Sequence, residues 1–92
     1  MKRLVICCDG TWNTLDAKYP TNVAKISRLT DPVDQNGIRQ IVHYDDGVGT
    51  GKGVVSQTFG RLTAGAFGWG LMDKVESAYR FLCKNYEAGD EI

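Results

Sequence analysis

The stretch Leu4-Val5-Ile6-Cys7-Cys8-Asp9-Gly10-Thr11 joins an apolar run to an abrupt polar turn. An unbroken apolar run, rather than an alternating one, is typical of a strand buried on both faces of a parallel sheet. We therefore predict a strand over Arg3 to Asp9. Asp9-Gly10-Thr11 is typical of a tight turn, and the carboxyl end of a parallel strand is where ligands bind in open α/β sheets.

A helix and a second strand follow at the spacing of a βαβ unit. Gly10 to Pro20 is predicted to be a loop, after which Thr21 or Asn22 caps a short helix. The apolar residues at helical spacing in it are Val23, Ile26 and Leu29. Gln40 to Asp45 is predicted to be the second strand. Two strands separated by one helix should be parallel, with a right-handed crossover between them.

The clearest helix in the sequence is predicted over Leu71 to Ala88, with Gly89 as its C-cap. Its charged residues lie on one face and its apolar residues form a stripe on the other. The stripe consists of Leu71, Val75, Ala78, Tyr79, Leu82 and Tyr86. We predict that it packs on the sheet through Val75, Tyr79 and Leu82. The preceding Arg61 to Gly70 is rich in small residues, which makes it a poor helix by propensity but allows close packing against a neighbour.

These elements predict the α/β class, with a βαβ unit and one following helix. Asp90-Glu91-Ile92 resembles the first residues of a third strand, which would pair beside the first strand. We therefore expect residues 1–92 to be part of one domain rather than a complete one. The edge over Leu4 to Cys8 would then be uncovered and prone to associate.

Composition excludes several classes of function. Eleven basic residues balance eleven acidic ones, so no charge excess favours nucleic acid or an anionic membrane. The apolar run at Leu4 to Cys8 is too short to span a bilayer, and Asp9 interrupts it before any cleavage site of a signal peptide. Three cysteines, Cys7, Cys8 and Cys83, do not form a disulfide framework or, with the single His43, a metal site. We expect His43 to be structural, and we expect no metal and no cofactor.

The sequence matches two phosphate-related motifs only in part. Gly47 to Gly53 follows the second predicted strand, yet its glycines fit neither the P-loop nor the dinucleotide spacing, and Gly53 stands where a P-loop has Ser or Thr. We interpret it as a flexible surface loop or lid segment. Asp9-Gly10-Thr11 also resembles the end of the D-x-D-G-T motif of haloacid-dehalogenase-like phosphatases. Cys7 takes the place of the nucleophilic aspartate, so that chemistry has no attacking carboxylate.

Several blocks of sequence, in order, resemble an uncharacterised α/β-hydrolase family that includes catalytic domains of type VI secretion phospholipase effectors. The resemblance covers essentially all 92 residues. It depends on Leu4 to Asn13, Pro20 to Val23, Tyr44 to Thr50, Gly65 to Leu71, Ala78 to Leu82, and Asn85-Tyr86 with Gly89 to Ile92.

The resemblance implies a serine esterase or lipase-type hydrolase acting on an acyl ester or phospholipid. In that family the segment resembling Gly89 to Ile92 leads into a G-x-S-x-G nucleophile elbow, with the triad Asp and His later still. The chain ends before these residues, so we expect it to be inactive alone. One oxyanion donor of such enzymes is a backbone N–H after an earlier strand, and Gly10 or Thr11 occupies that place. Asp9 would orient the turn, or would merely tie it through an Asx-type hydrogen bond.

Two alternatives remain open at this point. One is a non-catalytic, truncated or pseudo-domain that serves in folding or interaction, and the other is a nucleotide-binding α/β protein that uses Gly47 to Gly53. The expected location is the cytoplasm, or export by a secretion system that needs no signal peptide.

Overall fold

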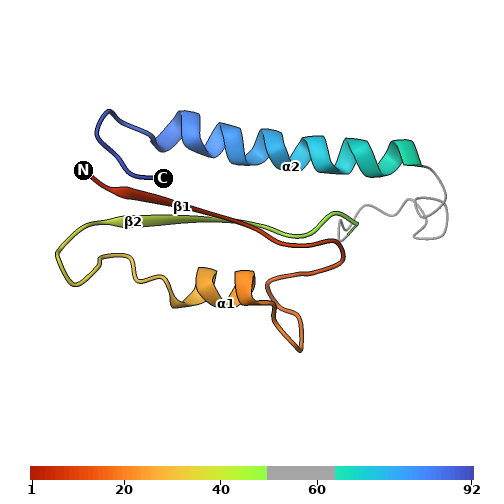
Figure 1. Ribbon diagram of the computed structural model, residues 1–92, viewed down its shortest axis with the longest axis horizontal. Coiled ribbons are helices and arrows are strands. Elements are labelled where there is room, and N and C mark those ends of the chain that lie inside the picture. The colour runs from red at the N-terminus through yellow and green to blue at the C-terminus, as the bar shows by residue number, and fades with distance from the viewer. Residues whose placement is uncertain (50–63) are drawn as a thin grey trace.

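The computed structural model describes residues 1–49 and 64–92, and it forms a βαβ unit followed by one long helix (Figure 1). The elements are β1 (Arg3–Cys8), α1 (Asn22–Leu29), β2 (Gln40–Asp45) and α2 (Ala64–Asn85). β1 and β2 pair in parallel, with a register that runs from Arg3 opposite Gln40 to Cys8 opposite Asp45. The predicted pair of parallel strands is therefore confirmed.

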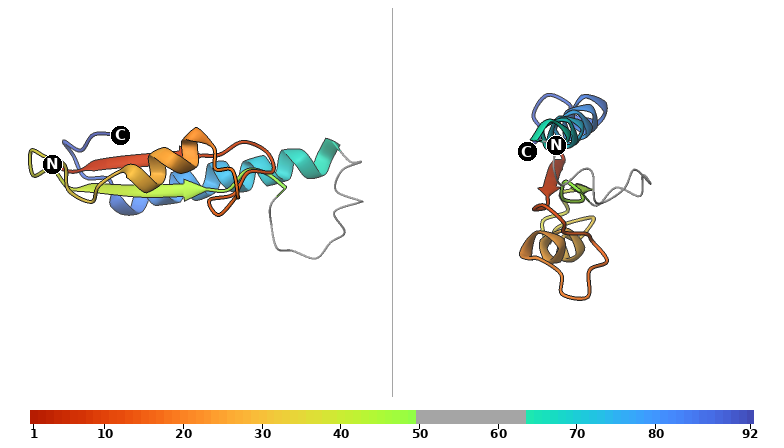
Figure 2. Two further views of the ribbon diagram at one scale, coloured as in Figure 1. Left: turned by 90° about the horizontal axis from the view of Figure 1, so that it is seen from below. Right: turned by 90° about the vertical axis from the view of Figure 1, so that its right-hand side faces the viewer.

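The sheet lies between the two helices. α1 packs on one face of the β1–β2 pair and α2 on the other, and the views in Figures 1 and 2 agree on this three-layer order. Both faces of β1 are thus covered, which explains why its sequence is continuously apolar. The structure has a two-stranded parallel sheet and two helices, and to this extent the predicted α/β class is confirmed.

The core is small and centres on β1. Leu4, Cys7 and Ala24 are its fully buried apolar residues among those described. α1 begins where the Thr21 hydroxyl accepts a hydrogen bond from the Ala24 N–H at 3.1 Å, so Thr21 is the N-cap. α1 contacts the sheet through Ala24, and Leu29 points to solvent.

The predicted bounds of the last helix were wrong at both ends. α2 spans Ala64–Asn85 and therefore includes most of the small-residue stretch that seemed a poor helix. Gly70 shows why small residues are needed there, because a Cβ at this position would lie 2.9 Å from Cγ1 of Val48. The tertiary contact between α2 and Val48 thus outweighs the low helix propensity of the small residues. Gly89 is not the C-cap but has φ 97° in the turn after α2, where the Asp90 N–H donates to the Glu87 carbonyl at 3.0 Å.

The face that α2 turns to the sheet was also predicted wrongly. Val75 and Tyr79 are 53% and 66% exposed, and Leu82 alone of the three predicted contacts is half-buried. From residue 70 onward, the half-buried residues of α2 are Gly70, Lys74, Ser77, Ala78, Phe81, Leu82 and Asn85. Polar groups lie on this face because β2 presents polar side chains to it, and Phe81 stacks on His43 with ring centroids 4.9 Å apart.

The C-terminal residues pair with β1 on the edge opposite β2. Glu91 forms a parallel bridge with Arg3, in which the Leu4 N–H donates to the Glu91 carbonyl at 2.8 Å and the Glu91 N–H donates to the Lys2 carbonyl at 3.1 Å. The prediction that this segment pairs beside the first strand is confirmed. No helix in the described parts of the chain is long and apolar enough to cross a membrane.

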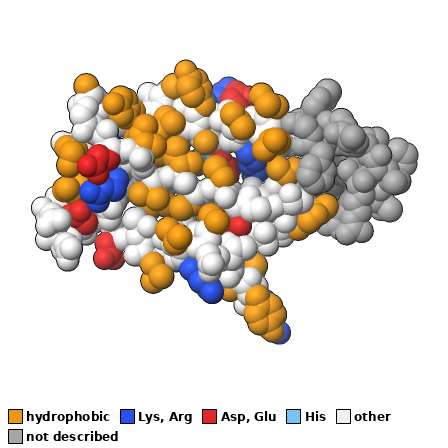
Figure 3. All heavy atoms as spheres, in the orientation of Figure 1, with side chains coloured by type: hydrophobic (Ala, Val, Ile, Leu, Met, Phe, Trp, Pro, Cys, Tyr) orange, Lys and Arg blue, Asp and Glu red, His pale blue; other side chains and the backbone are white. Residues whose placement is uncertain are grey.

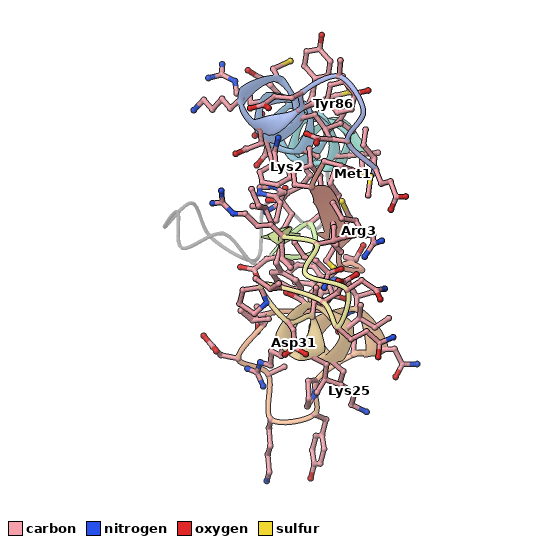
Figure 4. All side chains as sticks on the ribbon, turned by 90° about the vertical axis from the view of Figure 1, so that its left-hand side faces the viewer. Met1, Lys2, Arg3, Lys25, Asp31 and Tyr86 are labelled. Atoms are coloured by element: carbon pink, nitrogen blue, oxygen red, sulfur yellow. The ribbon has the colours of Figure 1, made fainter. Side chains whose placement is uncertain are left out.

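An ion pair fastens the two ends of the chain to each other. Lys2 Nζ lies 2.5 Å from Asp90 Oδ2, and the Lys2 backbone N–H donates to Oδ1 at 2.9 Å. Figure 4 views this end, with Lys2 on the α2 side near Tyr86 and Arg3 between the helices. The Lys2 hydrogen bond, aided by the Glu87 N–H and opposed by desolvation, lowers the pKa of Asp90 to about 2.

Beyond the Glu91 bridge, the outer edge of β1 has no backbone partner among the described residues. In a parallel ladder alternate residues bond to each neighbour, and Arg3 and Asp9 bond toward β2. Ile6 and Cys8 consequently direct their N–H groups to the outer edge. The views in Figure 2 place β1 on the side that faces the reader in Figure 3, where hydrophobic side chains cover much of the surface.

We predict that Asp90→Asn lowers the thermal stability of the chain at neutral pH. The folded-state pKa of Asp90 is depressed, so its contribution is present above the unfolded value, about 3.9, and is lost as pH falls toward the folded value. Melting curves between neutral pH and acid should show the mutant losing less stability than the wild type across that window. Glu87→Gln is the matched control, because Glu87 is exposed and its carboxylate lies 3.7 Å from Lys2 Nζ. An identical loss of stability with falling pH in the wild type and in Asp90→Asn would contradict the predicted contribution of Asp90.

We also predict an alternation of amide exchange along β1. In dilute monomer the Ile6 and Cys8 amides should exchange on the order of tenfold or more faster than those of Val5 and Cys7, because local protection follows backbone hydrogen bonding. Raising the protein concentration should protect Ile6 and Cys8 and increase the sedimentation coefficient, because an open strand edge templates association. A concentration-independent monomer with uniform protection would show that the edge is not open.

Candidate functional site

The turn after β1 lies where both strands end. The Asp9 N–H donates to the Asp45 carbonyl at 3.0 Å and extends the ladder one residue past β1. Parallel strands bring their carboxyl ends to one edge of a sheet. The predicted site residues Asp9, Gly10 and Thr11 therefore lie at the edge where β2 also ends.

The Asp9 carboxylate joins three segments of the chain. Its Oδ2 accepts hydrogen bonds from the Tyr44 hydroxyl of β2 at 2.5 Å and from the Thr21 hydroxyl at 2.8 Å, while Oδ1 accepts from the Gly10 N–H at 2.8 Å. Partial burial raises the pKa of Asp9, but the bonds from Tyr44, Thr21 and Gly10 outweigh it, so the pKa is lowered. We call Asp9, Tyr44 and Thr21 the Asp9 cluster.

Two members of the Asp9 cluster were missed in the sequence. Burial, followed by the bond to Asp9, raises the pKa of Tyr44, so its hydroxyl keeps its proton and donates the hydrogen bond to Asp9. Thr21 donates to Asp9 and accepts from Ala24, and this connects the N-terminus of α1 to the turn. The alternation of β2 was the available signal for Tyr44, since residues 42 and 44 face the layer opposite to residue 43.

The backbone N–H groups of the turn differ in whether they have a hydrogen-bond acceptor. Gly10 donates to Asp9, Trp12 donates to the Val48 carbonyl at 3.0 Å, and Asn13 donates to the Gly10 carbonyl at 3.0 Å. Among residues 1–49 and 64–92, no acceptor is bonded to the Thr11 N–H, and Thr11 is exposed. Of the two predicted donors, only Gly10 has an acceptor for its N–H within the described part of the chain. The Gly10 N–H donates to the Asp9 carboxylate, which is a local bond within the turn.

The loop after β2 packs directly on this turn. A Cβ at Gly47 would lie 1.6 Å from the Gly10 carbonyl oxygen, and the Gly47 N–H donates to the Asn13 carbonyl at 2.8 Å. A Cβ at Gly49, which has φ 94°, would lie 2.8 Å from the Trp12 ring. The described glycines thus permit close contact between loops, and Gly47 is buried rather than part of a flexible lid. Residues 50–53 of the predicted loop lie outside the described residues.

Trp12 has a left-handed backbone. Its φ of 67° is uncommon for a bulky residue, and such conformations cost of order 1–3 kcal/mol unless the surroundings fix them. Here the bond from the Trp12 N–H to Val48 and the contact with Gly49 fix it. The indole is half-exposed beside Thr11.

A second cluster has the composition of a catalytic triad but not its geometry. His43 Nε2 lies 2.8 Å from Asp45 Oδ2 and 3.3 Å from Ser77 Oγ. An ionised carboxylate can only accept, so Nε2 carries a proton and cannot remove one from Ser77. A working triad uses the two different ring nitrogens for acid and serine. Lys74 Nζ of α2 also lies 3.5 Å from Asp45 Oδ1 of β2. These side chains therefore connect α2 to β2, which agrees with a structural role for His43.

No arrangement for a metal is found among the described residues, where no group of three or more His, Cys, Asp or Glu side chains converges. Cys7 is buried, and this burial raises the pKa of its thiol. Cys8 and Cys83 are exposed and free.

Comparison with known proteins places these features in a family. The family described as "T6SS, Phospholipase effector Tle1-like, catalytic domain" matches residues 2–92. An uncharacterized protein of Saccharomyces cerevisiae, YEL023C, is 32% identical over 100 aligned residues, which cover 99% of this chain and 14% of that protein. The chain thus spans a small part of this curated relative. No solved structure matches. Because the family match covers nearly the whole chain, the protein belongs to the family of Tle1-like type VI secretion phospholipase effector catalytic domains.

Proposed function

We propose that the chain is the N-terminal part of a serine ester hydrolase domain of the α/β-hydrolase type, acting on the acyl ester of a phospholipid. The observation that carries this proposal is the open Thr11 N–H at the carboxyl ends of the strands, in a member of a phospholipase family. A donor fixed before the reaction stabilises the developing oxyanion without reorganisation. Thr11 is the proposed donor, and Gly10 and Asp9 hold its peptide in place.

The Asp9 cluster makes such a donor rigid. The Thr11 peptide lies between Gly10, whose N–H is bound to Asp9, and Trp12, whose N–H is bound to Val48. Asp9 in turn is held from β2 by Tyr44 and from α1 by Thr21. The turn is therefore fixed on both sides of the proposed donor. Preorganisation of this kind is what an oxyanion site requires.

The nucleophile and its base are not among these 92 residues. The chain contains no G-x-S-x-G, Ser27 lies in α1, and Ser77 meets the protonated nitrogen of His43. Ser56 lies outside the described residues. We propose that the isolated chain is inactive and that the rest of the triad is supplied by sequence following Ile92 in a longer protein. The nucleotide-binding alternative would use Gly47 to Gly53, of which residues 50–53 lie outside the described residues.

Activity should depend on the backbone of Thr11. The purified 92-residue chain should not hydrolyse a chromogenic short-chain ester above a buffer control, whereas a protein that continues this chain through a G-x-S-x-G and a later Asp and His should do so. In that protein Thr11→Pro deletes the donor and should lower kcat roughly 10²–10³-fold. Thr11→Ala is the matched control, because it keeps the N–H and should retain activity.

Folding must be measured beside turnover, because proline also restrains the turn. A Thr11→Pro protein with unchanged melting temperature and unchanged kcat would remove Thr11 from the mechanism. Turnover by the 92-residue chain alone would show that it is not an incomplete hydrolase.

The Asp9 cluster should be visible in an acid titration. Tyr44→Phe removes one donor to Asp9, so we expect a loss of about 1 kcal/mol in the free energy of unfolding and a rise in the pKa of Asp9 toward its ordinary value. Because the folded-state pKa of Asp9 is lowered, its contribution to stability exists above the unfolded pKa and is lost as pH falls through the folded pKa. Carboxyl NMR shifts would measure it. Tyr19→Phe, at an exposed loop position, should leave the pKa of Asp9 unchanged.

A further inference from the structure

α2 carries a row of large apolar side chains that stay in solvent. These side chains are 49–66% exposed and recur at the spacing of one face of a helix, and they belong to Leu71, Met72, Val75, Tyr79 and Tyr86. We call these five residues the α2 flank. The exposed charged residues of α2 lie on the other side of the helix and include Asp73, Glu76, Arg80 and Lys84. Because charged side chains already cover one exposed side of α2, a separate apolar flank indicates a second packing surface beside the one on the sheet.

The α2 flank lies on the same side of the molecule as the outer edge of β1. In Figure 3 hydrophobic side chains line α2 on the face toward the reader, and Figure 2 places β1 on that side. Ile92, which follows the bridge of Glu91 to this edge, is 72% exposed as well. An apolar helix flank beside a strand edge is typical of a surface that packs against further structure.

The Glu91 bridge shows in which direction the chain runs along this edge. The Leu4 N–H donates to the Glu91 carbonyl and the Glu91 N–H donates to the Lys2 carbonyl, which is the pattern of a parallel ladder. Residues that continued in this register would run beside Ile6 and Cys8. The bridge therefore marks the start of a parallel strand on the outer edge of β1.

The handedness of parallel crossovers then limits where a helix after that strand can lie. The connection from β2 to the Glu91 bridge passes to the far side of β1, and its helix, α2, covers one face of the sheet. A right-handed crossover that moved on in the same direction would place its helix on this face too, beside α2. A crossover that returned past β2 would place its helix on the α1 face. An apolar flank on α2, on the β1 side, favours the first arrangement.

We propose that the α2 flank is the docking surface for the helix that follows the strand continuing from Glu91 in the longer protein. This rests on the proposed function, because that proposal has the chain continue past Ile92. The docked helix presents an apolar stripe to Val75 and Tyr79, since the five residues of the α2 flank offer no charge for an ion pair. Two helices side by side on one face then cover the widened sheet.

Thiol labelling measures this docking without any catalysis. Val75→Cys, in a Cys8→Ser and Cys83→Ser background that removes the exposed native thiols, is treated with a maleimide, and mass spectrometry follows the α2 peptide. In the dilute 92-residue chain the new thiol should react quickly, because Val75 is 53% exposed. In the longer protein it should react on the order of tenfold or more slowly, because a covered thiol reacts only through local opening. Tyr79→Cys is a second reporter on the same flank, and it decides the outcome if Val75→Cys does not fold.

The matched control is Arg80→Cys in the same background. Arg80 lies on the charged side of α2, where its side chain is 69% exposed, so its thiol should react equally quickly in both proteins. Equal rates for Val75→Cys in the two proteins would overturn the proposal, and so would slow labelling of Arg80→Cys with fast labelling of Val75→Cys. Labelling of Val75→Cys that slows only as the concentration of the 92-residue chain rises would assign the flank to a second copy, and would also overturn it.

Labelling and turnover separate this proposal from the proposed function. A longer protein that protects Val75→Cys but hydrolyses no ester supports the docking surface while the hydrolase proposal fails. A longer protein that hydrolyses esters and labels Val75→Cys as fast as the short chain does overturns the docking surface and leaves the hydrolase proposal standing.

Discussion

The Asp9 carboxylate is the contact on which the arrangement of this end of the molecule depends. It accepts hydrogen bonds from the Tyr44 hydroxyl, the Thr21 hydroxyl and the Gly10 N–H, and so it connects β2, the start of α1 and the turn. A partly buried carboxylate is costly unless donors surround it, and here they outweigh the desolvation and lower its pKa. Removing one donor therefore affects three segments together.

Such polar contacts matter more than usual for the stability of this chain because its hydrophobic core is small. Leu4, Cys7 and Ala24 are fully buried, whereas large apolar residues of both helices face solvent. Hydrophobic burial of this extent stabilises little, as is general for small domains. The sheet is held instead at both ends, by the Asp9 cluster where the strands finish and by the Lys2–Asp90 pair where β1 begins. Between them, residues 1–49 and 64–92 supply no partner for the outer edge of β1 beyond its bridge to Glu91.

The arrangement of residues, rather than their types, decides what chemistry is available. His43, Asp45 and Ser77 include every side-chain type of a serine hydrolase triad, yet the acid and the serine meet the same ring nitrogen. That nitrogen must carry a proton and cannot act as a base. Conversely, the proposed role of Thr11 depends on its backbone, whose N–H has no acceptor among residues 1–49 and 64–92, while Gly10 and Trp12 donate to acceptors within the fold.

The sequence alone determined the parallel strands, an N-cap at Thr21 or Asn22 and the pairing of the C-terminal residues beside β1, because apolar runs, capping residues and element spacing are local signals. It also placed the candidate donor at Gly10 or Thr11, since the turn follows directly from the strand. The tertiary structure added that the Gly10 N–H is already bonded to the Asp9 carboxylate. It also decided which face of α2 meets the sheet, since His43 and Asp45 of β2 offer polar and aromatic partners that turn Ser77 and Phe81 inward and Val75 and Tyr79 outward. Periodicity along one helix cannot contain that information, because the preferred face depends on the chemistry of the surface it meets.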